Sequence, residues 1–490
     1  MLALKDQVCR YSEQHKSAST ADIFTADAIE NVPNFPSVYF LDRDVFDNSK
    51  IGLPSIEIRL APVVLEALQD TTDISTKYFS WVHLWMPIIS MARWKNELTG
   101  PLSRPRADVN ILALSMKLVL WAPGEDPHSR NPRHHEYLTL KSVFLRAETA
   151  GMFSLQLLQA LILLTIYEYS HAIYPAAYVS VGTCVRYGLA LGIDKQRQVE
   201  IDAKNLDLEE QEEKRRVWWA IIILDRIISR SATSPEPRPD DLLPVHDKDW
   251  DDGNINADRI YPVSAPASTN MGMLARLAQS AYLLGRVYRW QFHPTGNAQF
   301  DGEEQFQLDR ALRALLNLTY LEGATRLMPI CPQTALCFSA LIILHSQPGR
   351  ISPVVPNFGA AMSLQTTPYQ RHAAIAEVLQ FLRPIAQEST RSTAMFFRKK
   401  PWSIEKSSPL LIHWTYLIAV TYLRIKILLR AMSDPKSAGT YHDQGVTELV
   451  AQAEHGLDTM KQKLRLLGKQ WVSVDENLRA LEAREVASML

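Results

Sequence analysis

Residues Glu212–Arg226 read EEKRRVWWAIIILDR, and this stretch decides the fold class. Written as a helix, it is apolar around its whole circumference from Val217 to Leu224. A helix on a protein surface keeps one polar face, whereas a helix that is apolar on all sides lies inside a larger structure. The stretch therefore predicts a central helix surrounded by others.

Charged side chains precede this apolar segment. Glu210 and Lys214 are four residues apart in the favourable order, as are Glu212 and Arg216. Such pairs stabilise the outer face of a helix. We expect both pairs to support exposed first turns.

Asp225 lies where packing should exclude water, and a buried carboxylate needs a partner. The best candidate is Arg186, which lies in an apolar segment upstream. We predict an ion pair between Arg186 and Asp225 that ties two helices together. The alternative is that Asp225 caps local backbone while Arg186 reaches the solvent.

Helical periodicity extends over most of the remaining chain. Alternating strand patterns are nearly absent, and no repeat at a fixed period occurs. The expected fold class is all-α, a large array of roughly 12–15 helices with long proline-rich loops and little or no β structure. The predicted helices cover residues 57–70, 73–97, 106–121, 134–150, 154–172, 175–191, 206–232, 268–292, 302–323, 332–346, 367–388, 405–432, 443–467 and 474–488.

The chain is long enough for more than one lobe, because single cores rarely grow beyond about 250–300 residues. We expect an irregular N-terminal segment over residues 1–55, a helical core domain over 56–292 and a C-terminal helical lobe over 293–490. The longest break between helices, 231–270, is rich in proline and aspartate. A loop of this length is either functional or an ordered strap on the surface.

Composition argues against several functional classes. The chain has 52 lysines and arginines against 53 aspartates and glutamates, so it lacks the basic excess of a domain that grips the DNA backbone. Its 4 cysteines are scattered, as is typical of a reducing compartment. No signal-peptide pattern opens the sequence, and the longest apolar stretches are shorter than the roughly 20 residues that span a bilayer. We expect a protein that is neither secreted nor inserted in a membrane.

Three clusters invite a metal interpretation, and each has a better one. Cys331 and Cys337 are too far apart for ordinary zinc spacing, so buried thiols are favoured. The run 134–136, His-His-Glu, lacks the spacing of a zinc hydrolase helix. The aspartates of 240–252 suggest magnesium–diphosphate binding or a calcium loop, but a nearby proline and a late glycine favour a solvated acidic loop. We expect no metal and no cofactor.

Four segments resemble, in the usual order, the fungal-specific transcription factor domain, which is the regulatory middle domain of fungal zinc-cluster transcription factors. They are Phe35–Phe46 (FPSVYFLDRDVF), Tyr78–Ser90 (YFSWVHLWMPIIS), Gln156–Asp194 and Glu212–Arg226. The last is similar to the hallmark helix of the family. The structural motif that the resemblance implies comprises Arg186, Arg215, Arg216, Trp218, Trp219, Asp225 and Arg226.

The resemblance implies a nuclear regulator of transcription, controlling a metabolic or secondary-metabolite pathway, and not an enzyme. Family members begin with a binuclear zinc cluster of six closely spaced cysteines, which the four cysteines here cannot form. Either the protein lacks that module or the sequence starts downstream of it. Direct DNA binding is therefore in doubt, and contacts with other transcription factors or with a second copy are expected. The run 398–401, RKKP, suggests a minimal nuclear import signal, although most such runs are solvated loops.

Two other functions stay open. One is a small-molecule sensor whose effector lies between aromatic-rich helices, with a candidate pocket formed by Trp81, His83, Trp85, Trp218 and Trp219. Core packing is the commoner role of such aromatic side chains. The other is a helical enzyme derived from this fold, which would need polar side chains that converge in a pocket.

Overall fold

The computed structural model describes residues 34–488, except 50, 55, 57, 59, 61, 67, 69, 100–105, 196–207, 230–231, 326–330, 346–367, 398–402 and 433–443. In this described part the chain forms 18 α-helices and no strand. One isolated antiparallel bridge joins Leu242 and Pro262. The all-α prediction is confirmed.

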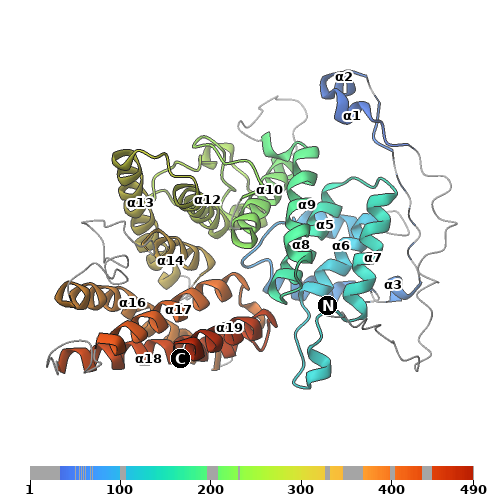
Figure 1. Cartoon of the computed structure of the whole chain (residues 1–490). Helices are drawn as coiled ribbons and strands as arrows, with labels where there is room; N and C mark the ends of the chain where they lie inside the picture. The colour runs from blue at the N-terminus through green and yellow to red at the C-terminus, as the bar shows by residue number, and fades with distance from the viewer. Residues whose placement is uncertain are drawn as a thin grey trace, which may run out of the picture.

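The helices form three successive groups along the chain (Figure 1). The N-terminal group is α1 (Val38–Leu41), α2 (Arg43–Asn48), α3 (Pro62–Glu66), α4 (Thr71–Trp81), α5 (Met91–Thr99), α6 (Ala107–Val119), α7 (His135–Thr149), α8 (Leu155–Ser170) and α9 (Ala176–Ala190). The middle group is α10 (Leu208–Ile228), α11 (Asp247–Asp251), α12 (Met273–Phe292), α13 (Ala298–Thr325) and α14 (Pro332–His345). The C-terminal group, orange to red in Figure 1, is α16 (Pro368–Phe397), α17 (Leu410–Met432), α18 (Gln444–Leu467) and α19 (Ser473–Ala487).

Two predicted helices are wrong in extent. The single helix predicted over 73–97 is two helices, because α4 ends at Trp81 and α5 begins at Met91. Pro87 lies between them, where its missing amide and bulky ring prevent a continuous helix. The helix predicted over 57–70 is only the short α3. These short pieces, with α1, α2 and α11, account for the excess over the expected number of helices.

Local sequence signals set several helix ends as expected. The hydroxyl of Ser154 accepts a hydrogen bond from the amide of Leu157 at 3.2 Å and so caps α8. Gly192 follows α9 with a φ of 70°, a left-handed conformation that suits glycine. These two signals set the start of α8 and the end of α9, the paired helices that precede α10 in the chain.

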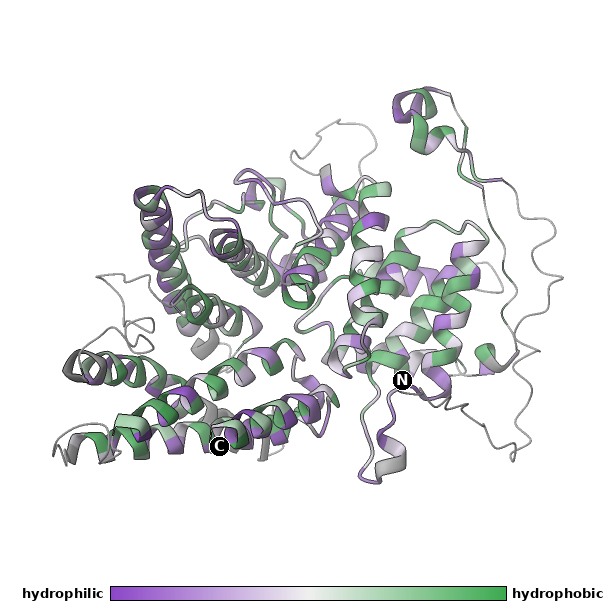
Figure 2. Cartoon of the chain, in the orientation of Figure 1, coloured by the Kyte–Doolittle hydropathy of each residue, from purple (hydrophilic) through white to green (hydrophobic). Residues whose placement is uncertain are grey.

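One hydrophobic cluster runs through all three groups, from Val64 in α3 to Leu481 in α19. Helix α8 is buried along almost its whole length, and α10 is buried from Val217 to Arg226. Both hydrophobic and hydrophilic residues are distributed along most other helices, as amphipathic packing requires (Figure 2). The surrounded central helix that the sequence predicts is thus α10. The proposed division at residues 55 and 292 stays a prediction.

Helix α17 is long and apolar enough to cross a membrane by length and composition alone. In the structure, however, 67% of its most apolar window is buried. It contacts α18, α14 and α19. Such burial is what a core helix shows.

Candidate functional site

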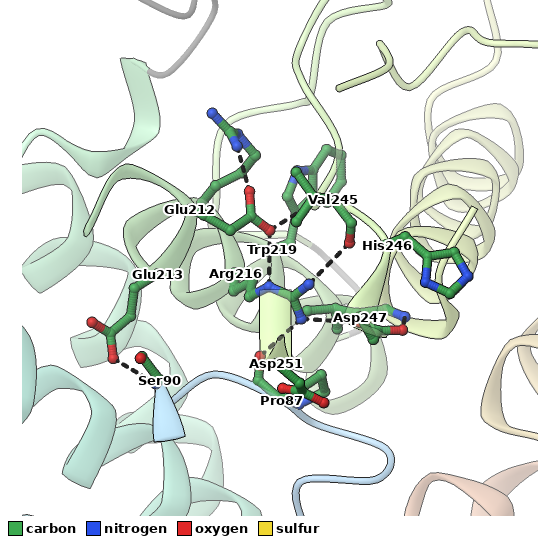
Figure 3. A network of polar contacts seen from close by, with 12 residues as sticks. Pro87, Ser90, Glu212, Glu213, Arg216, Trp219, Val245, His246, Asp247 and Asp251 are labelled. Carbon is green, nitrogen blue, oxygen red and sulfur yellow. Dashed lines mark hydrogen bonds and ion pairs between the residues drawn. The ribbon is translucent and has the colours of Figure 1, made fainter. Parts of the chain in front are cut away.

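The first half of α10 carries charged side chains that are fully enclosed. Glu212 and Arg216 have 0% of their surface exposed, and Arg215 has 3%. We call Glu212, Arg216 and Asp247 the buried charge cluster (Figure 3). Asp247 belongs to α11, which lies in the long connection between α10 and α12. We call the described residues of this connection, 232–272, the strap.

Arg216 is the centre of the buried charge cluster. Its Nε donates to Glu212 at 2.8 Å and its Nη1 donates to Asp247 at 2.9 Å. Its Nη2 donates to the carbonyl oxygen of Val245 at 2.9 Å. The guanidinium also stacks over Trp250, 4.0 Å from the ring centroid. Such a set of partners offsets the cost of burying a guanidinium.

The two carboxylates of the cluster accept hydrogen bonds from different backbone amides. Glu212 accepts from the amide of Val245 at 2.9 Å and also pairs with Arg215. Asp247 accepts from the amide of Met273 at 2.5 Å, at the first residue of α12. The cluster therefore fixes the strap to α10 and to the start of α12.

One of the two predicted helical pairs is exposed and the other is not. Glu210 and Lys214 form an ion pair of 2.7 Å with partly exposed side chains, as expected. The pair of Glu212 and Arg216 exists, but its predicted exposure is wrong. The strap covers this ion pair, and the spacing of two residues along one helix cannot predict that another segment will cover them.

A neighbouring carboxylate joins three helices. Glu213 accepts from the amide of Ser90 at 2.9 Å (Figure 3) and from the side chain of Gln159, also at 2.9 Å. Burial raises the pKa of Glu213 above its usual value. Ser90 precedes α5 and Gln159 lies on α8, so this residue connects α10 with both. Sequence reasoning did not single it out.

The predicted ion pair between Arg186 and Asp225 is wrong. Arg186 is exposed on α9. Asp225 is fully buried, but it accepts from the backbone amides of Thr233 and Ser234 at 3.0 and 2.8 Å and pairs with Arg226 at 3.0 Å. The carboxylate thus caps the start of the strap, which is the local alternative. Arg186 belongs to the predicted motif by resemblance only and contacts none of its other charged members in the described structure.

Arg226 and Arg276 complete the attachment of the strap. Arg226 is fully buried and donates to Ser234 at 2.9 Å. Burial lowers the pKa of its guanidinium, and the nearby Glu236 opposes that shift. Arg276 on α12 is also fully buried and donates to the carbonyl oxygens of Ala267 and Thr269. The sequence analysis missed Arg276, whose only signal is an arginine within an apolar helix.

The candidate aromatic pocket is mostly filled by packing. Trp85 is 3% exposed, and His83, 5% exposed, bonds to Asp251 at 3.0 Å as a core histidine. Trp219 donates to the carbonyl oxygen of Leu242 at 2.8 Å. Trp218 and Trp219 border a recess of about 10 Å³, enough for a single water. Trp81, at the end of α4, is half-buried.

The residues considered as metal ligands have separate partners. Asp247 binds Arg216, Asp251 binds His83, and Asp249 lies 3.6 Å from Arg259. Within the described residues, no group of three or more His, Cys, Asp or Glu side chains is arranged to hold a metal. Cys184, Cys331 and Cys337 are buried free thiols. Cys9 and the run 398–401 lie outside the described residues.

A larger cleft lies elsewhere, between the N-terminal and C-terminal groups. Its volume is about 490 Å³. Helix ends from α8, α10, α17 and α19 surround it, together with α12. We call it the central cleft. It is lined by Tyr169, Ala172, Tyr174, Ile227, Ile228, Tyr288, Ile412, His413, Ser473, Glu476 and Asn477.

Next to the central cleft, His171 connects the two groups. Its Nδ1 accepts from the amide of Val472 at 3.3 Å, and its ring lies 5.6 Å from that of Trp471. Burial lowers the pKa of His171 to about 3, so the ring is neutral at physiological pH. Arg130 pairs with Asp475 at 2.8 Å across the same boundary. The start of α19 is thus attached to the N-terminal group.

The charged side chains of α10 hold backbone and neighbouring helices, and they do not converge on a shared space for a substrate. A catalytic acid or base must reach a reacting group. Here Glu212, Arg216 and Asp225 form hydrogen bonds with the strap. The charged side chains of α10 thus hold the strap and neighbouring helices, and the central cleft offers room for a ligand.

Comparison with known proteins points to one family. The family model described as "Fungal specific transcription factor domain" matches residues 35–295. Transcription factor BOA15 of Botryotinia fuckeliana is 35% identical over 178 residues, which are 36% of this chain and 98% of that protein. Transcription factor tazR of Aspergillus terreus is 26% identical over 164 residues, 32% of this chain but only 25% of that protein. No solved structure matches.

The matched region runs from α1 to the end of α12 and contains the buried charge cluster, the strap and the first helices of the central cleft. More than half of the chain thus matches one family model, and nearly the whole of one relative aligns with it. The chain belongs to the family of proteins that carry the fungal specific transcription factor domain.

Proposed function

We propose that this protein is a nuclear regulator of transcription that controls a metabolic or secondary-metabolite gene cluster. The family match over residues 35–295 carries the proposal, since its two named relatives are both transcription factors. The protein acts through contacts with other transcription factors or with a second copy of itself. The 4 cysteines of this sequence are too few to form a binuclear zinc cluster among themselves, so this part of the protein is proposed to act without one.

A regulator is also favoured over a helical enzyme by the chemistry of the hallmark helix. Each buried carboxylate of that helix accepts hydrogen bonds from the strap or from a neighbouring helix. These contacts position backbone, and they leave no free pair of groups for acid–base work. The proposed role rests on the fold as a platform for regulation.

Deletion of the gene in its source fungus tests the proposal. We expect transcripts of one gene cluster to change, and a tagged full-length protein to accumulate in the nucleus. Restoring the gene should restore the transcripts. An unchanged transcriptome under conditions where the protein is expressed contradicts the proposed function.

The mechanism has its own test. Purified protein is titrated with duplex DNA across a salt series, with zinc content measured in parallel, and its mass in solution is measured by sedimentation. We expect weak, non-specific DNA binding without zinc. Tight binding to one sequence with a steep salt dependence would contradict the indirect mechanism, because phosphate contacts produce that dependence.

A second proposed function is that of a small-molecule sensor. The central cleft favours it, since about 490 Å³ falls in the range of drug-sized ligand sites. The predicted site among the tryptophans has no comparable space. An effector in the central cleft would touch both halves of the chain.

A further inference from the structure

The walls of the central cleft come from parts of the chain that are far apart in sequence. Tyr169 and Tyr174 lie at the turn between α8 and α9, and Tyr288 lies on α12. Ile412 opens α17, and Ser473 opens α19. A molecule in this space would therefore touch the N-terminal, middle and C-terminal groups at once.

The lining combines rings and aliphatic side chains with polar groups in comparable measure. Three tyrosine rings and three isoleucines lie beside the polar side chains at the starts of α17 and α19, His413, Ser473, Glu476 and Asn477. Ligand sites use apolar walls for contact area and polar groups to orient the ligand. The chemistry of the walls thus suits a flat ring system that also carries polar atoms.

Two phenol groups offer hydrogen bonds to such a molecule. Tyr169 and Tyr174 both line the cleft, and a phenol keeps its proton at neutral pH because its ordinary pKa is about 10, so each hydroxyl can donate. The Tyr169 side chain is 9% exposed and lines the cleft. Water or an oxygen acceptor on a ligand in the cleft can accept a hydrogen bond from its hydroxyl.

The charges around the cleft disfavour an anion. Its lining residues, all within the described part of the chain, include Glu476 but no lysine or arginine. Glu476 is itself paired with Arg479 at 2.5 Å. An anionic group placed in the cleft would lose hydration and lie near Glu476, and the lining side chain that could carry a positive charge against it is His413, when protonated.

The same short segment lines the cleft and joins the halves of the chain. The amide of Val472 donates to His171, and Asp475 pairs with Arg130. Ser473, Glu476 and Asn477, which alternate with these residues, face the cleft. Filling the cleft would hold the start of α19 against the turn after α8.

We propose that the central cleft binds a neutral aromatic molecule carrying a hydroxyl or carbonyl oxygen, and that the bound molecule strengthens the contact between α19 and the α8–α9 turn. This inference rests on the second proposed function. It gives the sensor a ligand class and a structural response. In such a regulator, ligand binding changes how firmly the C-terminal group is attached to the N-terminal group.

The test uses the full chain, with 2-naphthol as the neutral probe and 2-naphthoate as its anionic counterpart. Calorimetric titration should show one saturable site for 2-naphthol with a Kd on the order of 1 mM or below, as a ligand of this size permits. Binding of 2-naphthoate should be at least about tenfold weaker. Hydrogen exchange at the Val472 amide should slow when 2-naphthol is bound.

Variants locate the site. Asn477→Trp fills the cleft and should weaken 2-naphthol binding at least about tenfold. Glu482→Trp adds the same ring to an exposed position of the same helix and should leave binding unchanged. Tyr169→Phe keeps the shape of the wall but removes the donor, and should weaken binding about fivefold. The urea midpoint of each variant checks that it folds.

The proposal fails if 2-naphthol shows no saturable binding, if 2-naphthoate binds as tightly, or if both tryptophan variants behave alike with Tyr169→Phe unaffected. Unchanged exchange at Val472 on binding would overturn the structural response. These outcomes concern the purified protein alone. An unchanged transcriptome after gene deletion would instead refute the proposed role in transcription and leave the binding result standing.

Discussion

Replacing Arg216 by methionine gives the sharpest test of the buried charge cluster. Methionine keeps most of the volume but removes the cation that bonds to Glu212, Asp247 and the carbonyl oxygen of Val245. Glu212 then remains fully buried with one cationic partner, Arg215, instead of two. Removing one partner of a buried ion pair costs about 3–5 kcal/mol, because the other charge is left uncompensated.

That loss would take a large share of the roughly 5–15 kcal/mol that stabilises a typical protein. It should fall first on the strap, since Arg216 joins α10 to it. Urea unfolding should show a lower midpoint, and hydrogen exchange should become faster at the amide of Val245, which donates to Glu212.

The matched control is Lys214→Met, two residues earlier on the same helix. Lys214 pairs with Glu210, but both side chains are more than a third exposed. Breaking an exposed pair of this kind should cost at most about 0.5 kcal/mol. If Arg216→Met costs no more than the control, the reasoning is refuted, and the strap must be held by its other contacts.

Three further predictions follow from buried groups. Gly285→Ala should destabilise the protein by about 1–3 kcal/mol, because the new Cβ would lie 2.6 Å from Nε of the buried Arg226. Gly302→Ala, where the new Cβ meets nothing, should stabilise the protein slightly. Midpoints of urea unfolding compare the two variants. The pKa of His171 is lowered to about 3 in the folded protein, so its contribution to the free energy of unfolding is present above about pH 6.5 and is lost as the pH drops toward 3. The free energy of unfolding should fall by about 2 kcal/mol between pH 6.5 and pH 5. His171→Gln should flatten that part of a curve of stability against pH. Burial raises the pKa of the Cys184 thiol to about 12, so iodoacetamide should label it only after unfolding; rapid labelling in the folded protein, read by mass spectrometry, would contradict its burial.

Much of the fold was predictable because its signals are local. The hydroxyl of Ser154 and the left-handed Gly192 act on the residues next to them, so the ends of α8 and α9 follow from the sequence. The break at Pro87 was equally local, and the prediction of one long helix there undervalued a strong signal. The burial of α10 could be predicted because its apolar surface covers all sides.

The partners of the charged groups could not be predicted in the same way. Asp225 was correctly expected to be buried, but its donors are two amides of the strap. The predicted ion pair with Arg186 was chemically sound and wrong. Opposite charges on two helices are compatible with many arrangements, and only the path of the strap decides which atoms meet.

The helical class, the burial of α10 and of Asp225, and the resemblance that points to transcription follow from the sequence alone. Helix periodicity, capping and burial patterns act over a few residues, and a single chain displays them. The cover of Arg216 by the strap, the packing of Trp85 and Trp219 in the core, and the meeting of Tyr169, Ile412 and Asn477 around one cleft could be learned only from the tertiary structure. Those facts depend on how segments hundreds of residues apart pack against each other, and that packing is a property of the whole chain.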